Sequence, residues 1–216
     1  MDENREMKEG NCKYHLKDVA ELHNDTILKD NMMFSTVLLS KEVHNDERCI
    51  VACSFSNEKL GQQLHIIDAT NDELIKSKIV HKKTMAKILT SFDVFLISCS
   101  VPGDVVIIDA RTGSVVKKLA ITDYEVANMC VHGNSKHSEP LQIVFTKVGD
   151  HIVYVMDIAS KSVQCEMEGH VGYITTIQVV EQISPNNSTL IISTSEDMTC
   201  RSWYLDTGKE KKRFQT

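Results

Sequence analysis

Four short segments of similar chemistry recur along the 216-residue chain and constrain its fold more than any other feature. They are LHIIDAT (64–70), VVIIDARTG (105–113), VYVMDIASK (153–161) and RSWYLDTGK (201–209). When Ile67, Ile108, Met156 and Trp203 are aligned, the spacings are 41, 48 and 47 residues. Repetition at this length is typical of a chain in which each period forms one small structural unit.

Each period also holds three further segments that predict β-strands, because they are short, rich in β-branched and aromatic residues, and bounded by turn residues. They are 32–39, 49–55 and 74–80 in the first period, 84–91, 94–100 and 114–121 in the second, 126–131, 142–147 and 162–167 in the third, and 174–180, 190–195 and 209–214 in the fourth. The middle segments are apolar on both faces, so each sheet is expected to be covered on both sides. Four strands per period without a helical unit indicate propeller blades rather than a βαβ fold.

The fourth period carries a recognisable motif. Gly169-His170 is followed by Ser193, by Ser195-Glu196-Asp197-Met198-Thr199 and by Trp203-Tyr204-Leu205-Asp206-Thr207-Gly208. This series resembles one repeat of the WD-repeat β-propeller family, with Tyr204 where the family usually has Asp. The second and third periods keep pieces of the pattern: Asp109 and Asp157 in the strand ends, and Ser98, Thr146 and Asp150 in earlier positions.

The resemblance implies an all-β fold with four recognisable four-stranded blades, most simply an incomplete propeller. The expected boundaries are 31–80, 81–121, 122–168 and 169–216, after an N-terminal segment at 1–30. That segment has apolar residues at the spacing of one helical face, and a docking helix, a partial blade and disorder all remain open for it. Four blades can be explained in three ways. The chain is a fragment or short isoform of a longer array, an arc completed by another chain, or a tight four-bladed ring.

The resemblance also implies a structural hydrogen-bond network of His170, Ser193, Asp197 and Trp203. Ser, His and Asp in one blade raise the alternative of a hydrolase triad, which would make the chain an enzyme on a propeller scaffold. Ser193, however, lies inside an apolar strand, and the chain has no Gly-x-Ser-x-Gly elbow to expose a nucleophile. We therefore expect a structural role for these residues and no catalytic ones.

In WD-repeat proteins the usual contact face is lined by the loops that enter each blade and by the turns between its two middle strands. The candidate partner-binding residues at these places are Tyr124, Tyr173, Lys83, Glu125, His151, Glu196 and Met198. Tyr124 and Tyr173 are the expected anchors, because aromatic side chains contribute disproportionately to interface energy. The alternative is that both rings only pack against their own blades.

Composition narrows the function further. A net charge of −6 and a pI near 5.8 argue against nucleic acid as the main partner. The charged N-terminus and the lack of a long apolar run predict no signal peptide and no membrane span, hence a cytoplasmic or nuclear location. The seven cysteines form no CxxC pair and the histidines no ligand set, and no Walker-type loop occurs, so we expect no metal and no cofactor.

The leading expectation is therefore a non-catalytic scaffold or adaptor that binds other proteins or peptides through its loop face, with another chain or further blades needed if the ring is to close. A second hypothesis is a substrate receptor of a cullin-type ubiquitin ligase. Such receptors carry a WD-x-Arg end to one repeat, which Ile108-Asp109-Ala110-Arg111 resembles with Ile in place of Trp. A propeller-based enzyme is the third.

Overall fold

A computed structural model describes residues 33–39, 50–57, 61–68, 73–81, 86–92, 95–101, 103–134, 139–180 and 188–215. The predictions for segment 1–30 and for Lys83 lie outside the described residues. Within those residues there is no helix with the length and apolar character needed to cross a bilayer.

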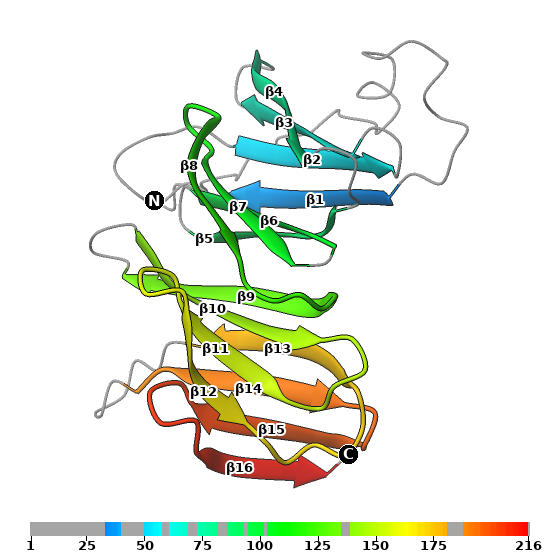
Figure 1. The fold of residues 1–216 in the computed structure, drawn as a ribbon, viewed down its shortest axis with the longest axis vertical. Helices are drawn as coiled ribbons and strands as arrows, with labels where there is room; N and C mark the ends of the chain where they lie inside the picture. The colour runs from blue at the N-terminus through cyan, green and yellow to red at the C-terminus, as the bar shows by residue number, and fades with distance from the viewer. Residues whose placement is uncertain are drawn as a thin grey trace, which may run out of the picture. The chain divides into compact units, whose positions relative to one another are not determined.

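The described strands form four antiparallel sheets of four strands each, and strands that follow one another in sequence are neighbours in each sheet (Figure 1). The first blade contains β1 (Met33–Leu39), β2 (Ile50–Asn57), β3 (Gly61–Asp68) and β4 (Glu73–His81). The second contains β5 (Ala86–Phe92), β6 (Phe95–Ser100), β7 (Asp104–Asp109) and β8 (Ser114–Ala120). The third contains β9 (Val126–Asn134), β10 (Glu139–Lys147), β11 (Val153–Asp157) and β12 (Ser162–Met167). The fourth contains β13 (Ile174–Val180), β14 (Leu190–Ser195), β15 (Thr199–Tyr204) and β16 (Glu210–Gln215).

The middle strands are buried on both faces, as their apolar sequences predict. All four residues of Val105–Ile108 in β7 and all four of Val153–Met156 in β11 are buried. The outer strands differ: the six residues of β16 are all exposed, and β8 alternates between exposed and partly buried positions. Lysines on such an outer edge discourage pairing with other chains.

Successive blades pack face to face through three apolar clusters. The alternation of side chains along a strand sends neighbouring residues to opposite faces. Ile107 of β7 therefore packs with Ile143 and Phe145 of the third blade, while Val106 and Ile108 pack with apolar residues of the first. The third cluster joins the third and fourth blades and contains Val144, Val153, Val155, Met167, Ile174, Ile191, Trp203 and Leu205. Each fully buried side chain of this size contributes about 1.5–3 kcal/mol relative to an exposed one.

Tight turns join the strands where the sequence places glycine. Gly113 and Gly208 have φ values of 66° and 67°, a region that costs glycine little. Their N–H groups donate to the carbonyl oxygens of Asp109 and Tyr204, each at 2.8 Å. Both turns therefore use a backbone conformation that favours glycine.

The fold is a partial propeller. Backbone contacts connect the innermost strands β1 with β5, β5 with β9, and β9 with β13. The described strands of the fourth blade neither pair with nor pack extensively against those of the first. The predicted all-β class and its four four-stranded blades are confirmed.

Candidate functional site

The fourth blade contains a continuous chain of hydrogen bonds between side chains. Trp203 donates from Nε1 to the Ser193 Oγ at 2.8 Å, and that hydroxyl lies 2.8 Å from His170 Nε2. His170 Nδ1 lies 2.9 Å from Asp197 Oδ2. A single proton arrangement satisfies all three contacts: the indole donates to the hydroxyl, the hydroxyl to the imidazole and the imidazole to the carboxylate.

The order of these residues in the sheet follows from strand register. Trp203 in β15 pairs with Ile191 in β14, and Ser193 lies two residues further along β14, on the same face. This face packs against the third blade, so Trp203 is 1% exposed and Ser193 is fully buried. His170 enters from the loop before β13, where Gly172 allows the chain to approach the Asp197 turn closely. A Cβ atom on Gly172 would lie 2.6 Å from the Asp197 backbone nitrogen.

Asp197 is the charged residue at one end of this series of hydrogen bonds. Its carboxylate accepts hydrogen bonds from the Val171 N–H at 3.0 Å, the Thr199 N–H at 2.9 Å and the Thr199 hydroxyl at 2.6 Å, in addition to His170. Burial alone would raise the pKa of this carboxyl, but the hydrogen bonds outweigh it and lower the pKa well below its ordinary value. The ionised form is thus fixed in the folded blade.

This arrangement does not give Ser193 the access that a nucleophile needs. Its hydroxyl has no solvent exposure and is already engaged by Trp203 and His170. Within the described part of the chain, no group of three or more His, Cys, Asp or Glu side chains could hold a metal ion. The geometry is that of a brace between the entering loop and the two middle strands.

The second and third blades replace this brace with bonds to a neighbouring blade. Met156 occupies the position of Trp203 and has no N–H to donate. The buried Thr146 hydroxyl instead lies 3.2 Å from the Nδ2 of Asn128, which also donates to the Ile174 carbonyl of the fourth blade at 3.0 Å. In the second blade, Ser98 donates to the Gln62 Oε1 of the first blade at 2.5 Å.

The loops of the third and fourth blades carry exposed apolar side chains. We call the following set the loop surface: Tyr124, Glu125, Val148, His151, Val171, Tyr173, Glu196 and Met198. These residues lie in the loops before β9 and β13 and in the turns that follow β10 and β14, which antiparallel pairing brings to the same end of both sheets. Tyr124 is 67% exposed, Tyr173 52% and Val171 81%.

Backbone bonds and ring contacts hold the loop surface together. Val148 N–H donates to the Glu125 carbonyl, and Glu196 N–H to the Tyr173 carbonyl, both at 2.9 Å. The His151 and Tyr173 ring centroids are 5.3 Å apart, which connects the third blade to the fourth. Four of the predicted contact residues thus belong to two bonded groups. Glu125 is bonded to Val148, and His151, Tyr173 and Glu196 form the second group, while Lys83 is not described.

Lys147 contacts two tyrosine rings, one of which is Tyr124 of the loop surface. Its Nζ lies 3.9 Å from the ring centroid of Tyr154 and 5.5 Å from that of Tyr124. Tyr154 in turn donates to Asp150 at 2.5 Å. Tyr124 therefore touches its blade through a cation contact while most of its ring faces solvent, so packing against the blade does not account for the whole side chain.

One residue of the loop surface, Val148, was missed by the sequence analysis. It is 56% exposed, and the signal that could have found it is an apolar residue inside a polar turn. Met198 was predicted from its position, but its backbone was not: its φ of 61° is a left-handed conformation that a methionine rarely adopts.

The blades and their mutual packing define a partial β-propeller, and the hydrogen-bond chain of its fourth blade resembles that of a WD repeat. No protein-family model matches the chain. Among curated proteins, THO complex subunit 6 of Arabidopsis thaliana is 35% identical over 66 residues, which are 31% of this chain and 17% of that protein.

Solved structures show the same fold. A chain of the mitotic checkpoint complex superposes with a TM-score of 0.59 and 16% identity, over 77% of this chain and 49% of that one. The computationally designed Ika8 protein gives a TM-score of 0.54 and 19% identity, over 78% of this chain and 49% of that one. This chain therefore spans about half the length of the solved chains, and its sequence match covers 17% of the curated relative. The two natural proteins are, by their names, components of multi-protein complexes.

Proposed function

We propose that this chain is a non-catalytic scaffold or adaptor and that it binds partner proteins through the loop surface. The observation that carries the proposal is the concentration of exposed apolar side chains on loops that are fixed by backbone bonds. Tyr124, Val148, Val171, Tyr173 and Met198 are each more than half exposed. A rigid surface of this kind loses little conformational entropy when a partner binds.

The charges around the rings favour a partner segment with basic side chains. Asp123 and Glu196 are both exposed: Asp123 precedes Tyr124 in the chain, and the Glu196 N–H donates to the Tyr173 carbonyl. A lysine or arginine of a partner could pair with these carboxylates and lie over a tyrosine face. Similarity to subunits of two named assemblies supports a role in complex formation, and a cytoplasmic or nuclear location stays a prediction.

Site-specific crosslinking in cells tests the proposal. A photoreactive phenylalanine is placed at Tyr173, and in a matched variant at Phe214, which is 48% exposed on the edge strand β16. We expect discrete protein adducts from position 173 and none in common with position 214. Adducts that are the same at both positions, or none at 173, would refute the proposal.

The contribution of the anchors is then measured with the partner that the crosslink identifies. Tyr124→Ala is expected to weaken its binding by about thirtyfold or more, because truncation of an interface tyrosine at a hot spot costs about 2 kcal/mol or more. Val163→Ala, at an exposed position of β12, is the control and should leave the affinity unchanged.

The ligase-receptor hypothesis has a separate structural basis. Arg111 lies in the turn after β7, and its Nε and Nη2 donate to the Asp109 carboxylate at 3.1 and 2.8 Å, which leaves the guanidinium partly exposed. If the chain is a receptor, Arg111→Ala should abolish recovery of a ligase subunit while crosslinks at the loop surface persist. If it is only an adaptor, the recovered proteins should not change.

A further inference from the structure

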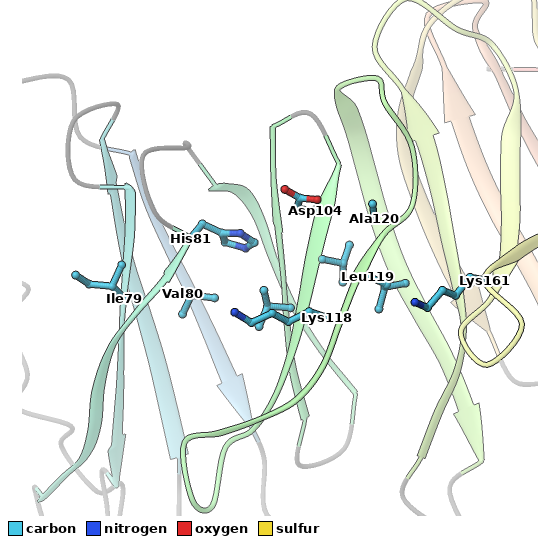
Figure 2. A pocket seen from close by; sticks show the side chains of 10 residues that line it. Ile79, Val80, His81, Asp104, Lys118, Leu119, Ala120 and Lys161 are labelled. Carbon is cyan, nitrogen blue, oxygen red and sulfur yellow. The ribbon is translucent and has the colours of Figure 1, made fainter.

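A hollow of about 590 Å³ lies between the first and second blades. Figure 2 shows its lining side chains on β4, β7 and β8, with one more from the turn after β11. The lining residues are Ile79, Val80, His81, Asp104, Val105, Val106, Lys118, Leu119, Ala120 and Lys161. The volume is in the range of pockets that hold small molecules.

One buried polar atom of this hollow has no partner in the protein. His81 is 6% exposed, and its Nε2 has no hydrogen-bond partner. Lys118 extends from β8 toward the facing strand β4, which also carries His81 (Figure 2). Among the described residues, neither Lys118, Lys161 nor Asp104 forms an ion pair. Buried polar atoms without partners are uncommon in native proteins, and each calls for an explanation.

The electrostatic balance of the hollow is opposite to that of the chain. Two ammonium groups and one carboxylate line it, although the whole chain has a net charge of −6. The environment also affects His81: burial lowers the pKa of its imidazole, the Lys118 ammonium lowers it further, and a backbone hydrogen bond to Ser98 and the Asp104 carboxylate act in the opposite direction. Additional negative charge beside the ring would favour its protonated form.

We propose that this hollow binds a small organic anion, with its phosphate or carboxylate group between Lys118 and His81. The oxyanion would accept hydrogen bonds from the Lys118 ammonium and from the protonated Nε2 of His81, which removes the orphaned buried nitrogen. Val80, Val105 and Leu119 provide an apolar wall for the organic body. Lys161 adds positive charge from the third blade. This inference does not depend on the proposed protein-binding function, which uses different side chains.

Three probes of similar size distinguish the sources of binding. Phenyl phosphate, benzoate and the uncharged benzyl alcohol are titrated into the whole chain at low ionic strength, with calorimetry as the readout. We expect saturable binding of one or both anions and weaker or no binding of the alcohol. Tighter phenyl phosphate identifies a phosphate site, and tighter benzoate a carboxylate site. Equal binding of benzyl alcohol, or no saturable binding of either anion, overturns the proposal.

Variants then locate the site. Lys118→Gln removes an exposed charge and should leave the fold intact, yet it is expected to weaken anion binding by about tenfold, the loss of one charge-assisted hydrogen bond. Lys209→Gln, which removes the same charge next to β16, is the control and should bind as the wild type does. A Lys118→Gln chain that binds with unchanged affinity overturns the proposal.

The proton taken up by His81 gives an independent readout. Binding should strengthen as the pH falls from about 8 to about 6, because the anion and the proton stabilise one another at the same imidazole. In His81→Gln this pH dependence should disappear. A wild-type affinity that does not change with pH contradicts the assignment of His81.

Discussion

The Ser193→Ala substitution removes a single oxygen atom and leaves two buried groups without partners. The Ser193 hydroxyl accepts from Trp203 Nε1 and contacts His170 Nε2, both at 2.8 Å. Trp203 is 1% and His170 5% exposed, so water cannot easily replace the lost oxygen at either atom. The smaller alanine side chain fits in the strand without a clash, but it can form neither hydrogen bond.

The magnitude follows from the two orphaned groups. Leaving one buried donor or acceptor unsatisfied costs about 1–3 kcal/mol. Because Trp203 and His170 share the same oxygen and can relax together, we expect about 2–4 kcal/mol for Ser193→Ala rather than the full sum. For a domain of this size that is a fall in Tm of roughly 4–16 °C.

Urea unfolding followed by fluorescence measures this cost directly, because Trp203 is the only tryptophan in the chain. The control is Thr175→Val, which removes a hydroxyl whose bond to Thr194 lies on the exposed face of β13 and should cost less than about 0.5 kcal/mol. In the double variant Ser193→Ala with Trp203→Phe, followed by circular dichroism, the orphaned indole N–H is gone. The double variant should therefore lose less unfolding free energy than the two single variants together, by about 1 kcal/mol or more. A Ser193→Ala variant no less stable than Thr175→Val would refute the brace.

Three further predictions concern single groups. The depressed pKa of Asp197 contributes stability that is present above its ordinary value and is lost as the pH falls through the folded-state value. The free energy of unfolding of Asp197→Asn should therefore change less than that of the wild type between about pH 4 and about pH 2 in urea titrations. Met198→Gly should raise the free energy of unfolding by about 0.5–1 kcal/mol, because glycine tolerates the φ of 61°, while crosslinking at the loop surface falls. Burial raises the pKa of Cys99 and Cys130 to about 12 each, so mass spectrometry after iodoacetamide treatment near pH 8 should find both unmodified until urea is added.

Much of the fold was predictable because each blade is a local structure. A strand pattern and a turn glycine such as Gly113 or Gly208 act within about ten residues, and their repetition at a similar spacing specifies how the units stack. The fourth blade was predictable in greater detail because the resemblance supplied four residues that must meet, and the structure brings His170, Ser193, Asp197 and Trp203 within hydrogen-bonding distance of one another.

Contacts between different repeats were not predictable in the same way. Asn128 lies 46 residues from the Ile174 carbonyl that it reaches, and Ser98 lies 36 residues from Gln62. No local pattern connects such pairs, because their meeting depends on how two sheets twist against each other. The hollow at His81 was missed for the same reason: its walls come from three strands of two blades and a turn of a third.

Where the sequence departs from the repeat motif, the buried hydroxyl groups have different hydrogen-bond partners. In the fourth blade, Trp203 provides a donor, so the Ser193 hydroxyl is satisfied inside its own blade. Where Met156 and Ile108 replace that tryptophan, the donor is lost, and the buried hydroxyls of Thr146 and Ser98 bond side chains that connect to, or lie on, an adjacent blade. The weakest matches to the motif are therefore the places where hydrogen bonds hold one blade to the next, and replacing them with consensus residues would strengthen single blades at the expense of the contacts between them.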